Sequence, residues 1–169
     1  MPELAFISIG SNIQPEKHLP LAVARLPRIG ELVAFSTVCQ TPAVGPTPQA
    51  DFLNAAALLR TELSPDQIRR RLRQIEAELG RQRTEDKYAP RTIDLDLALL
   101  GDQVMETTEL TLPDPEILTH PHLAIPLAEL APNHIHPVTH ERLQDIAERL
   151  RPNAELKPRP DVHLTTEQA

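Results

Sequence analysis

The chain has 169 residues, 40% hydrophobic and 24% charged, a composition typical of a soluble globular protein with a core of its own. Its net charge of −7 argues against nucleic acid or an anionic membrane as the main partner. No apolar run approaches the length of a membrane span, and no basic region precedes the first apolar stretch, so we expect neither a transmembrane helix nor a signal peptide. The single cysteine, Cys39, cannot form an internal disulfide; we expect a cytoplasmic protein in which Cys39 is an unreactive strand residue.

The first part of the chain alternates strand and helix signals. Residues 4–10, LAFISIG, predict a buried strand that ends in the turn residues of GSN. Apolar residues at helical spacing follow over residues 19–26, and Pro20 places the start of this helix close to itself. Residues 31–41 and 51–63 predict two strands, joined by a proline-rich loop that we expect to be extended and partly mobile.

The middle of the chain contains the best-marked helix. Ser64 and Gln67 form a capping-box pattern, and Gly80 ends the helix. An alternating strand follows at residues 92–100, then an irregular stretch with a short apolar segment, and a last helix from Thr139.

This order of elements predicts an α+β fold, a ferredoxin-like two-layer sandwich with helices packed on a mainly antiparallel sheet. We expect one domain over residues 1–151. Residues 152–169 contain three prolines and no periodicity, which predicts a loose C-terminal tail.

Asp94 and Asp96 are the most unusual feature of the predicted strands, because in a strand they point to the same face, about 6.5–7 Å apart. Like charges so close disfavour joint ionisation, so the pair needs compensation. Three interpretations are open: surface aspartates paired with arginines, a general acid/base pair as in glycoside cleavage, and a hard-metal site for an ion such as Mg²⁺.

The surrounding sequence favours the metal site. Residues 69–91 carry eight basic and four acidic side chains, and Arg91 lies three residues before Asp94. Guanidinium groups bind phosphate well, while Mg²⁺ bridges carboxylates to phosphates. A glycosidase would need a stacking aromatic, and the chain has three Phe, one Tyr and no Trp. Neither of the common glycine-rich phosphate motifs is present, so arginines and metal would have to hold a nucleotide.

The stretch YAPRTIDLDLALLG, residues 88–101, resembles the signature of the 6-hydroxymethyl-7,8-dihydropterin pyrophosphokinase family of folate biosynthesis. ISIGSN, TPAVGP, DFLNAA, IEAELGRQR and PLAELAP resemble further family segments, in the same order, over about residues 4–150. The resemblance implies transfer of the terminal pyrophosphate of the co-substrate ATP to the pterin hydroxymethyl group, with release of AMP. It also implies two Mg²⁺ ions and small-molecule partners, and we expect a monomer.

The same resemblance implies a role for individual residues. Asp94 and Asp96 would bind the metal ions, and Arg81 and Arg91 would contact phosphate from a mobile catalytic loop. The positions near the nucleotide are Glu76, Arg83, Tyr88, Arg91, the Leu97 backbone, Thr111 and His120. The pterin positions are Thr41, Pro42, Val44, Phe52, Asn54 and His122, although Phe52 could equally be a core residue. Loops at 43–50 and 81–91 would close over both substrates and exclude water.

Several positions depart from the family pattern. Tyr88 stands where Trp is frequent, His122 where an aromatic stacks on the pterin, and His120 where an arginine is usual. Positions where Arg, His and Tyr contact the nucleotide in other members are occupied by Glu109, Asp114 and Pro115. These changes predict weaker or differently arranged ATP binding.

Two further hypotheses therefore stay open. The first is a catalytically weak paralogue that acts as a pterin- or nucleotide-binding module; the retained Asp94 and Asp96 favour the enzyme, since a pure binder has no need of a metal pair. The second, a small-ligand or oligomerising module on the same scaffold, leaves the motifs unexplained. The histidines at 120–122 and 134–136 match no zinc spacing, and we interpret them as structural or solvent-facing.

Overall fold

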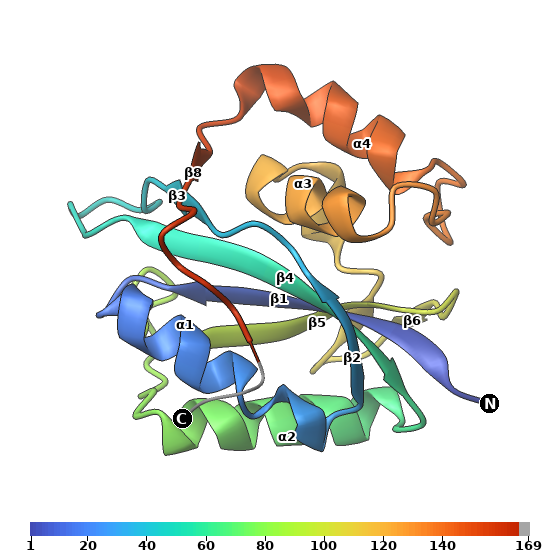
Figure 1. The fold of residues 1–169 in the computed structure, drawn as a ribbon, viewed down its shortest axis with the longest axis horizontal. Coiled ribbons are helices and arrows are strands. Elements are labelled where there is room, and N and C mark those ends of the chain that lie inside the picture. Colours follow the sequence, from blue (N-terminus) through green and yellow to red (C-terminus); the bar gives the residue numbers. More distant parts are fainter. Residues whose placement is uncertain (166–169) are drawn as a thin grey trace.

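A computed structural model of the chain describes residues 1–165. It contains a six-stranded sheet, a separate two-stranded hairpin and four α-helices (Figure 1). Every strand pair in this described range is antiparallel, which confirms the α+β class. In chain order the elements are β1 (Glu3–Ser11), α1 (Pro15–Val23), the 3-10 turn η1 (Leu26–Arg28), β2 (Glu31–Phe35), β3 (Cys39–Thr41), β4 (Phe52–Thr61), α2 (Pro65–Glu78), β5 (Asp94–Leu100), β6 (Met105–Glu106), β7 (Thr111–Leu112), η2 (Pro115–Leu118), α3 (Pro121–Leu130), α4 (Leu143–Leu150), η3 (Arg151–Asn153) and β8 (Lys157–Pro158).

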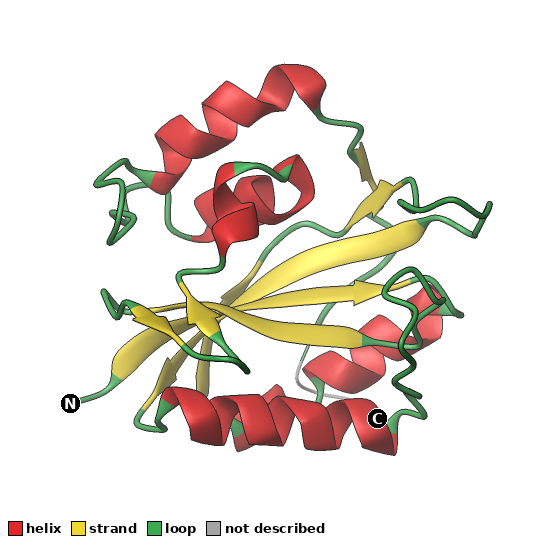
Figure 2. Ribbon diagram, turned by 180° about the vertical axis from the view of Figure 1, so that it is seen from behind, coloured by secondary structure: helices red, strands yellow, loops and turns green. Residues whose placement is uncertain are grey.

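Helices cover both faces of the sheet (Figures 1 and 2). The sheet and the α1/α2 layer form the predicted sandwich, and α3 with α4 adds a further layer on the other face. The apolar segment that sequence reasoning did not assign to a helix is α3, which lies between the sheet and α4. A helix buried on both sides has no clear polar stripe, and α3 also contains Pro126, so its sequence lacks the usual helical signal.

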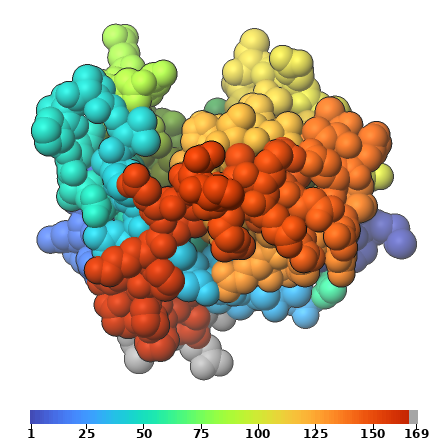
Figure 3. Space-filling model, turned by 90° about the horizontal axis from the view of Figure 1, so that it is seen from above, coloured from blue at the N-terminus to red at the C-terminus, as the bar shows by residue number. Residues whose placement is uncertain are grey.

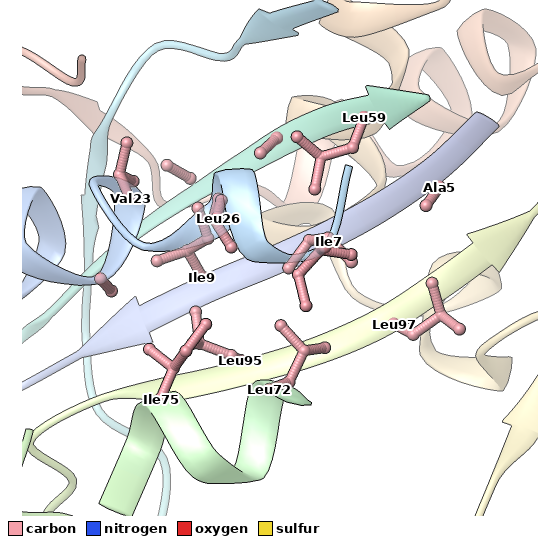
Figure 4. Packing of buried hydrophobic residues seen from close by; sticks show 14 of the residues in the cluster. Ala5, Ile7, Ile9, Val23, Leu26, Leu59, Leu72, Ile75, Leu95 and Leu97 are labelled. Carbon is pink, nitrogen blue, oxygen red and sulfur yellow. The ribbon is translucent and has the colours of Figure 1, made fainter. Parts of the chain in front are cut away.

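The larger of two cores lies between the sheet and the α1/α2 layer. Ile7, Ile9 and Leu95 extend from the strands toward Leu72 and Ile75 of α2 (Figure 4). All five side chains are almost fully buried, which fixes α2 against β5. The second, smaller core lies between the sheet and α3/α4.

The helix boundaries follow the sequence signals in part. The capping box at the start of α2 is confirmed, since Ser64 Oγ accepts from the Gln67 N–H at 3.2 Å and Gln67 Oε1 accepts from the Ser64 N–H at 2.9 Å. By contrast, α1 begins at Pro15 and includes Pro20, whereas Pro20 was expected to mark its start. Pro20 is the sixth residue of α1, so the Glu16 carbonyl lacks the N–H that another residue at position 20 would donate to it.

Two predicted elements differ in extent. The single strand expected at residues 31–41 is two strands, β2 and β3, which pair with successive parts of β4. The last helix begins at Leu143 and not at Thr139, because His136 Nδ1 accepts the N–H groups of Val138 and Thr139 and holds them in a turn.

A β-bulge changes the faces of β5. Ile7 pairs with Leu97 and Phe6 with Leu99, so Ala98 is an extra residue on β5. Strict alternation predicted Leu99 on the same face as Leu97. The bulge instead turns Leu99 to the opposite face, where it joins Phe6 and Ala98 in the second core.

The C-terminal segment is packed along the sheet. Residues 157–158 form β8 beside β3, and Val162 and Leu164 pack against the larger core. The expectation of a loose tail is therefore wrong for this part, although residues 166–169 of that tail lie outside the described residues. The segment shows no periodicity because its prolines exclude a long strand, and only two of its residues pair with β3.

Candidate active site

The site lies on the sheet face that α3 and α4 cover only in part. Gly10 of β1 pairs with Asn54 of β4 on one side and with Asp94 of β5 on the other. One step along the same face, Ser8 pairs with Asp96. Adjacent strands are about 4.8 Å apart, so Asn54 and Asp94 face the same space about 10 Å from each other, across a glycine.

A cleft of about 480 Å³ opens over this row of residues. It brings together most of the positions that the family resemblance implied. Eleven of them line it: Thr41, Pro42, Val44, Phe52, Asn54, Tyr88, Arg91, Asp94, Asp96, His120 and His122.

A second hollow, of about 550 Å³, lies between α2 and the turn of the β6–β7 hairpin. Three further predicted residues, Glu76, Arg81 and Arg83, line it together with Arg69, Arg73, Ala77, Thr108 and Glu109. Leu97 is buried in the larger core and Thr111 is exposed on β7, and neither side chain lines either of these two hollows. Ion pairs join the two hollows, from Arg81 to Asp94 and from Arg73 to Asp96.

Glu76 is the centre of the charged part of the site, although its side chain is only 2% exposed. Its Oε1 accepts from Arg73 at 3.0 Å and from Arg83 at 2.7 Å. Its Oε2 accepts from Arg81 at 3.2 Å and from the backbone N–H of Leu95 at 2.8 Å. This buried carboxylate is therefore fully partnered, and it fixes the arginines against β5.

The two aspartates have different proton affinities. Burial alone would raise the pKa of Asp94, but Arg91 at 2.8 Å and Arg81 at 3.1 Å outweigh it and hold that pKa below its ordinary value. Partial burial, followed by the charge of Asp94, raises the pKa of Asp96 to about 7, against the opposing effect of Arg73. The two carboxyl groups therefore lose their protons in sequence as the pH rises, Asp94 first and Asp96 near pH 7.

The other half of the cleft is neutral. Asn54 Nδ2 donates to Thr41 Oγ1 at 2.6 Å, which fixes the amide and leaves its oxygen directed along the sheet. A Cβ on Gly10 would lie 3.0 Å from Asn54 Oδ1 and 3.7 Å from the ring of Phe52. Glycine at this position therefore leaves space for a flat ligand against the sheet.

The two predicted loops lie side by side (Figure 3), and both contact Asn12 in the turn that precedes α1. Asn12 Oδ1 accepts from the Arg91 N–H at 2.7 Å, and Asn12 Nδ2 donates to Gln49 Oε1 at 2.9 Å. Gln49 in turn donates to the Tyr88 carbonyl. Gly45, at φ +141°, packs on the Tyr88 ring so closely that a Cβ would lie 3.0 Å from it. Loop 43–50 thus borders the cleft together with loop 81–91.

Comparison with known proteins identifies the family. The sequence profile described as 7,8-dihydro-6-hydroxymethylpterin-pyrophosphokinase (HPPK) matches residues 6–132. The chain belongs to the HPPK family. It is 36% identical over 149 residues to the Synechocystis 2-amino-4-hydroxy-6-hydroxymethyldihydropteridine pyrophosphokinase, covering 86% of this chain and 75% of that protein. With the Bacillus subtilis protein of the same name it shares 38% over 133 residues, covering 77% and 79% of the two chains.

Two larger proteins contain a similar region. The Schizosaccharomyces pombe folic acid synthesis protein fol1 is 33% identical over 151 residues, which cover 88% of this chain and 20% of fol1. The HPPK fold also matches a crystal structure of wild-type Plasmodium falciparum HPPK-DHPS with pterin and p-hydroxybenzoate, at a TM-score of 0.69 and 11% identity. That match covers 94% of this chain, which spans 46% of the solved chain.

Three of the positions that depart from the HPPK pattern, Asp114, His120 and His122, line one wall of the cleft together with Glu116. The rings of His120 and His122 meet edge to face at 5.2 Å, and burial, followed by the charge of His120, lowers the pKa of His122. His122 is therefore neutral at pH 7. Along this wall Asp114 stands where the family pattern has a histidine, and His120 where it has an arginine. Glu109 pairs with Arg69 at 3.5 Å.

Sequence reasoning missed several residues of this candidate site. The most important is Arg73, whose guanidinium donates to Glu76, to the Leu95 carbonyl at 3.0 Å and to Asp96 at 3.2 Å. Burial alone would lower the pKa of Arg73, but Glu76 and Asp96 raise it. The spacing of Arg73 and Glu76 on one helix face was a usable signal. Glu116 and Lys87 also line the cleft; Lys87 belongs to the basic stretch 69–91, but neither residue was assigned a role from the sequence.

The donor set fits a hard divalent cation shared with a substrate. Within residues 1–165 no group of three or more His, Cys, Asp and Glu side chains is placed to hold a metal. Asp94 and Asp96 together offer carboxylate oxygens in the cleft, and burial, followed by the charge of Asp94, raises the pKa of Asp96 even with Arg73 beside it. Mg²⁺ is commonly bound by one or two carboxylates plus substrate phosphates, which this pair matches.

The same described part of the chain contains no helix long and apolar enough to cross a membrane.

Proposed function

We propose that this protein transfers pyrophosphate from ATP to the hydroxymethyl group of 6-hydroxymethyl-7,8-dihydropterin, releasing AMP, as a step of folate synthesis. One observation carries the proposal: the strand register places the Asn54 amide, Gly10 and Asp94 in one row. A neutral half and a half in which arginines pair with carboxylates therefore share one cleft. Membership of the HPPK family and the names of the curated relatives support the same reaction.

The reaction joins one oxygen to the β-phosphorus and separates another. The hydroxyl oxygen of the pterin substituent forms a bond to the β-phosphorus of ATP as the bond from that phosphorus to the AMP oxygen breaks. The hydroxyl proton is released, and AMP leaves with the electron pair of the broken bond. Such a transfer depends mainly on positioning and on stabilising negative charge.

The charged half would supply that stabilisation. Asp94 and Asp96 would hold two Mg²⁺ ions, and these ions would draw negative charge from the phosphate oxygens. Arg91 and Arg81 would exchange part of their contact with Asp94 for phosphate oxygens, which guanidinium forks bind well. Arg83, which is half exposed beside Glu76, would meet the nucleotide in the second hollow.

The neutral half would orient the pterin. Asn54, held by Thr41, would read the polar edge of the ring, because a fixed amide offers both a donor and an acceptor. Phe52 and His122 would cover the ring faces, while Pro42 and Val44 would close the cleft from loop 43–50. Exclusion of water by this loop and loop 81–91 would protect the transfer from hydrolysis.

We further propose that the protein acts as a cytoplasmic monomer with small-molecule partners alone. Its one cysteine is a buried free thiol, and burial raises the pKa of Cys39, so the thiol is unreactive. ATP as co-substrate and a free thiol both suit a reducing compartment.

A second candidate is a weakly catalytic module that binds the pterin without efficient transfer. The acidic wall favours it, since Asp114 and Glu116 face the space where a polyphosphate would lie. Burial also raises the pKa of Asp114, which reduces but does not remove this repulsion.

The test is an assay for AMP formed from ATP and 6-hydroxymethyl-7,8-dihydropterin, with and without Mg²⁺. Metal-dependent AMP that requires the pterin is the expected result. Folded protein that binds the pterin and forms no AMP would overturn the proposal in favour of the binding module. AMP formed equally without pterin would contradict the assigned acceptor.

A further inference from the structure

The C-terminal segment contacts the strand that leads into loop 43–50. Residues 157–158 extend the sheet as β8, and the Arg159 N–H donates to the Val38 carbonyl at 2.8 Å. In Figure 1, β8 lies next to β3, and the chain then passes along the edge of the sheet toward α1. Val162 and Leu164 anchor this passage on the larger core. The segment thus covers the outer edge of β3.

The side chain of Arg159 reaches across that edge. Its Nη1 donates to Gln40 Oε1 at 3.0 Å, and its Nη2 lies 3.3 Å from Glu16 Oε1 on α1. Asp161 holds the guanidinium in this orientation through two contacts of 2.9 Å each. Arg159 is only 22% exposed, so its geometry is defined by the groups around it.

Gln40 in turn closes the base of the loop. Its Nε2 donates to Asp51 Oδ2 at 2.8 Å, so Gln40 on β3 is joined to Asp51, the residue that follows loop 43–50. The neighbouring pair, Thr41 and Phe52, is the last step of the β3–β4 ladder. Both Thr41 and Phe52 line the cleft, and Thr41 holds Asn54.

We propose that Arg159 is a positioning residue for the neutral half of the site, acting through Gln40 on the base of loop 43–50. This inference deepens the proposed function and rests on it where it concerns the pterin. Because Gln40 accepts from Arg159 through its oxygen, its amide nitrogen is directed to Asp51. Without Arg159 the Gln40 side chain is free to rotate, and the outer edge of the three-residue strand β3 is then held by its two-residue pairing with β8.

Arg159→Ala and Gln40→Leu each remove the hydrogen bond from Arg159 Nη1 to Gln40 Oε1, the first by changing the donor and the second by changing the acceptor. The matched control is Arg142→Ala, which removes an arginine whose Nε and Nη2 contact Asp145 at 3.1 Å each, the same kind of two-point pair on α4. We expect about a three- to tenfold rise in KM for the pterin in both test variants, since the loss of one hydrogen bond of ordinary strength has roughly this effect. The KM for ATP should not change. The KM for the pterin should be no higher in the double variant than in either single variant, because both substitutions remove the same hydrogen bond.

Hydrogen exchange of the substrate-free protein provides a readout that does not depend on activity. Amides of residues 41–52 should exchange several-fold faster in both test variants and at the wild-type rate in Arg142→Ala. Unchanged exchange in these amides would overturn the inference, as would faster exchange with an unchanged KM for the pterin. If the wild-type protein forms no AMP, the proposed function fails, and the exchange rates alone then decide whether Arg159 orders the loop.

Discussion

The two halves of the cleft are built in opposite ways. In the charged half, Glu76 and Asp94 are held by arginines from α2, from the loop that follows it, and from the residues just before β5, and one buried carboxylate accepts four bonds. In the neutral half, one hydrogen bond between Asn54 and Thr41 and the β3–β4 register set the geometry.

This difference shows which contacts fix the geometry of each half. The charged half is fixed by the folded chain itself, so its dipoles and charges are in place before any substrate arrives, which is the arrangement that favours catalysis. The neutral half depends on a loop whose ends are joined by Gln40 and Asp51. Substitutions should therefore act on turnover and folding in the first half, and on pterin affinity in the second.

The largest effect is expected from Asp96→Asn. The amide keeps the shape but removes the carboxylate that completes the proposed Mg²⁺ site, so Mg²⁺-dependent AMP formation should fall by about a thousandfold or more. The far-ultraviolet circular dichroism should not change. Asp145→Asn, which alters an exposed aspartate of α4, is the control and should keep full activity. Turnover that survives in Asp96→Asn would show that Asp96 is not needed to bind the metal.

Glu76→Gln should mainly affect stability. The variant leaves Arg73, Arg81 and Arg83 without their shared buried carboxylate, and breaking such a buried pair costs about 3–5 kcal/mol. Urea unfolding measures the loss. Glu78→Gln, two residues later in the same helix, breaks an exposed pair with Arg28 and should leave the unfolding midpoint nearly unchanged. Equal midpoints for the two variants would show that Glu76 is not the organising group of this half.

Asn54→Leu tests the neutral half. It keeps the size of the side chain but removes the donor that Thr41 accepts and the groups proposed to read the pterin edge. The KM for the pterin should rise about ten- to a hundredfold, because a site built to hydrogen-bond its ligand loses most when a polar group is left unpaired. The KM for ATP should stay constant. Asn133→Leu, an exposed asparagine after α3, serves as the control. A large effect on ATP and none on the pterin would reverse the assignment of the two halves.

The same contrast explains what sequence could predict. Alternation placed Asp94 and Asp96 on one face, and the capping box gave the start of α2, because both depend on neighbours within a few residues. The contact of Arg73 with Asp96 joins residues 23 positions apart, and its existence depends on how α2 lies across β5. The bulge at Ala98 likewise depends on β1. Local patterns show which residues carry charge, while packing decides which charges meet.

The pH dependence of the charged half follows from Asp96. Its ordinary pKa of 3.8 is raised to about 7 in the folded protein, so this group stabilises the metal-free fold fully below about pH 4, and that contribution is lost as the pH rises through 7. A bound cation must displace the same proton. Apparent Mg²⁺ affinity, measured with ATP by calorimetry, should therefore weaken roughly tenfold from pH 8 to pH 6. A flat profile over this range would mean that Asp96 is ionised throughout.

The smallest effect is expected from the acidic wall. His120 lies 3.9 Å from Glu116, and it lines the cleft where the family pattern has an arginine. His120→Arg would add a permanent charge and a forked donor, which should tighten ATP binding about two- to tenfold. The control is His163→Arg, which adds the same charge on an exposed part of the C-terminal segment. An equal gain in both variants would indicate general attraction of a polyphosphate to a less acidic protein. A gain confined to His120→Arg would show that this wall faces the phosphates, beside the carboxylates of Asp114 and Glu116.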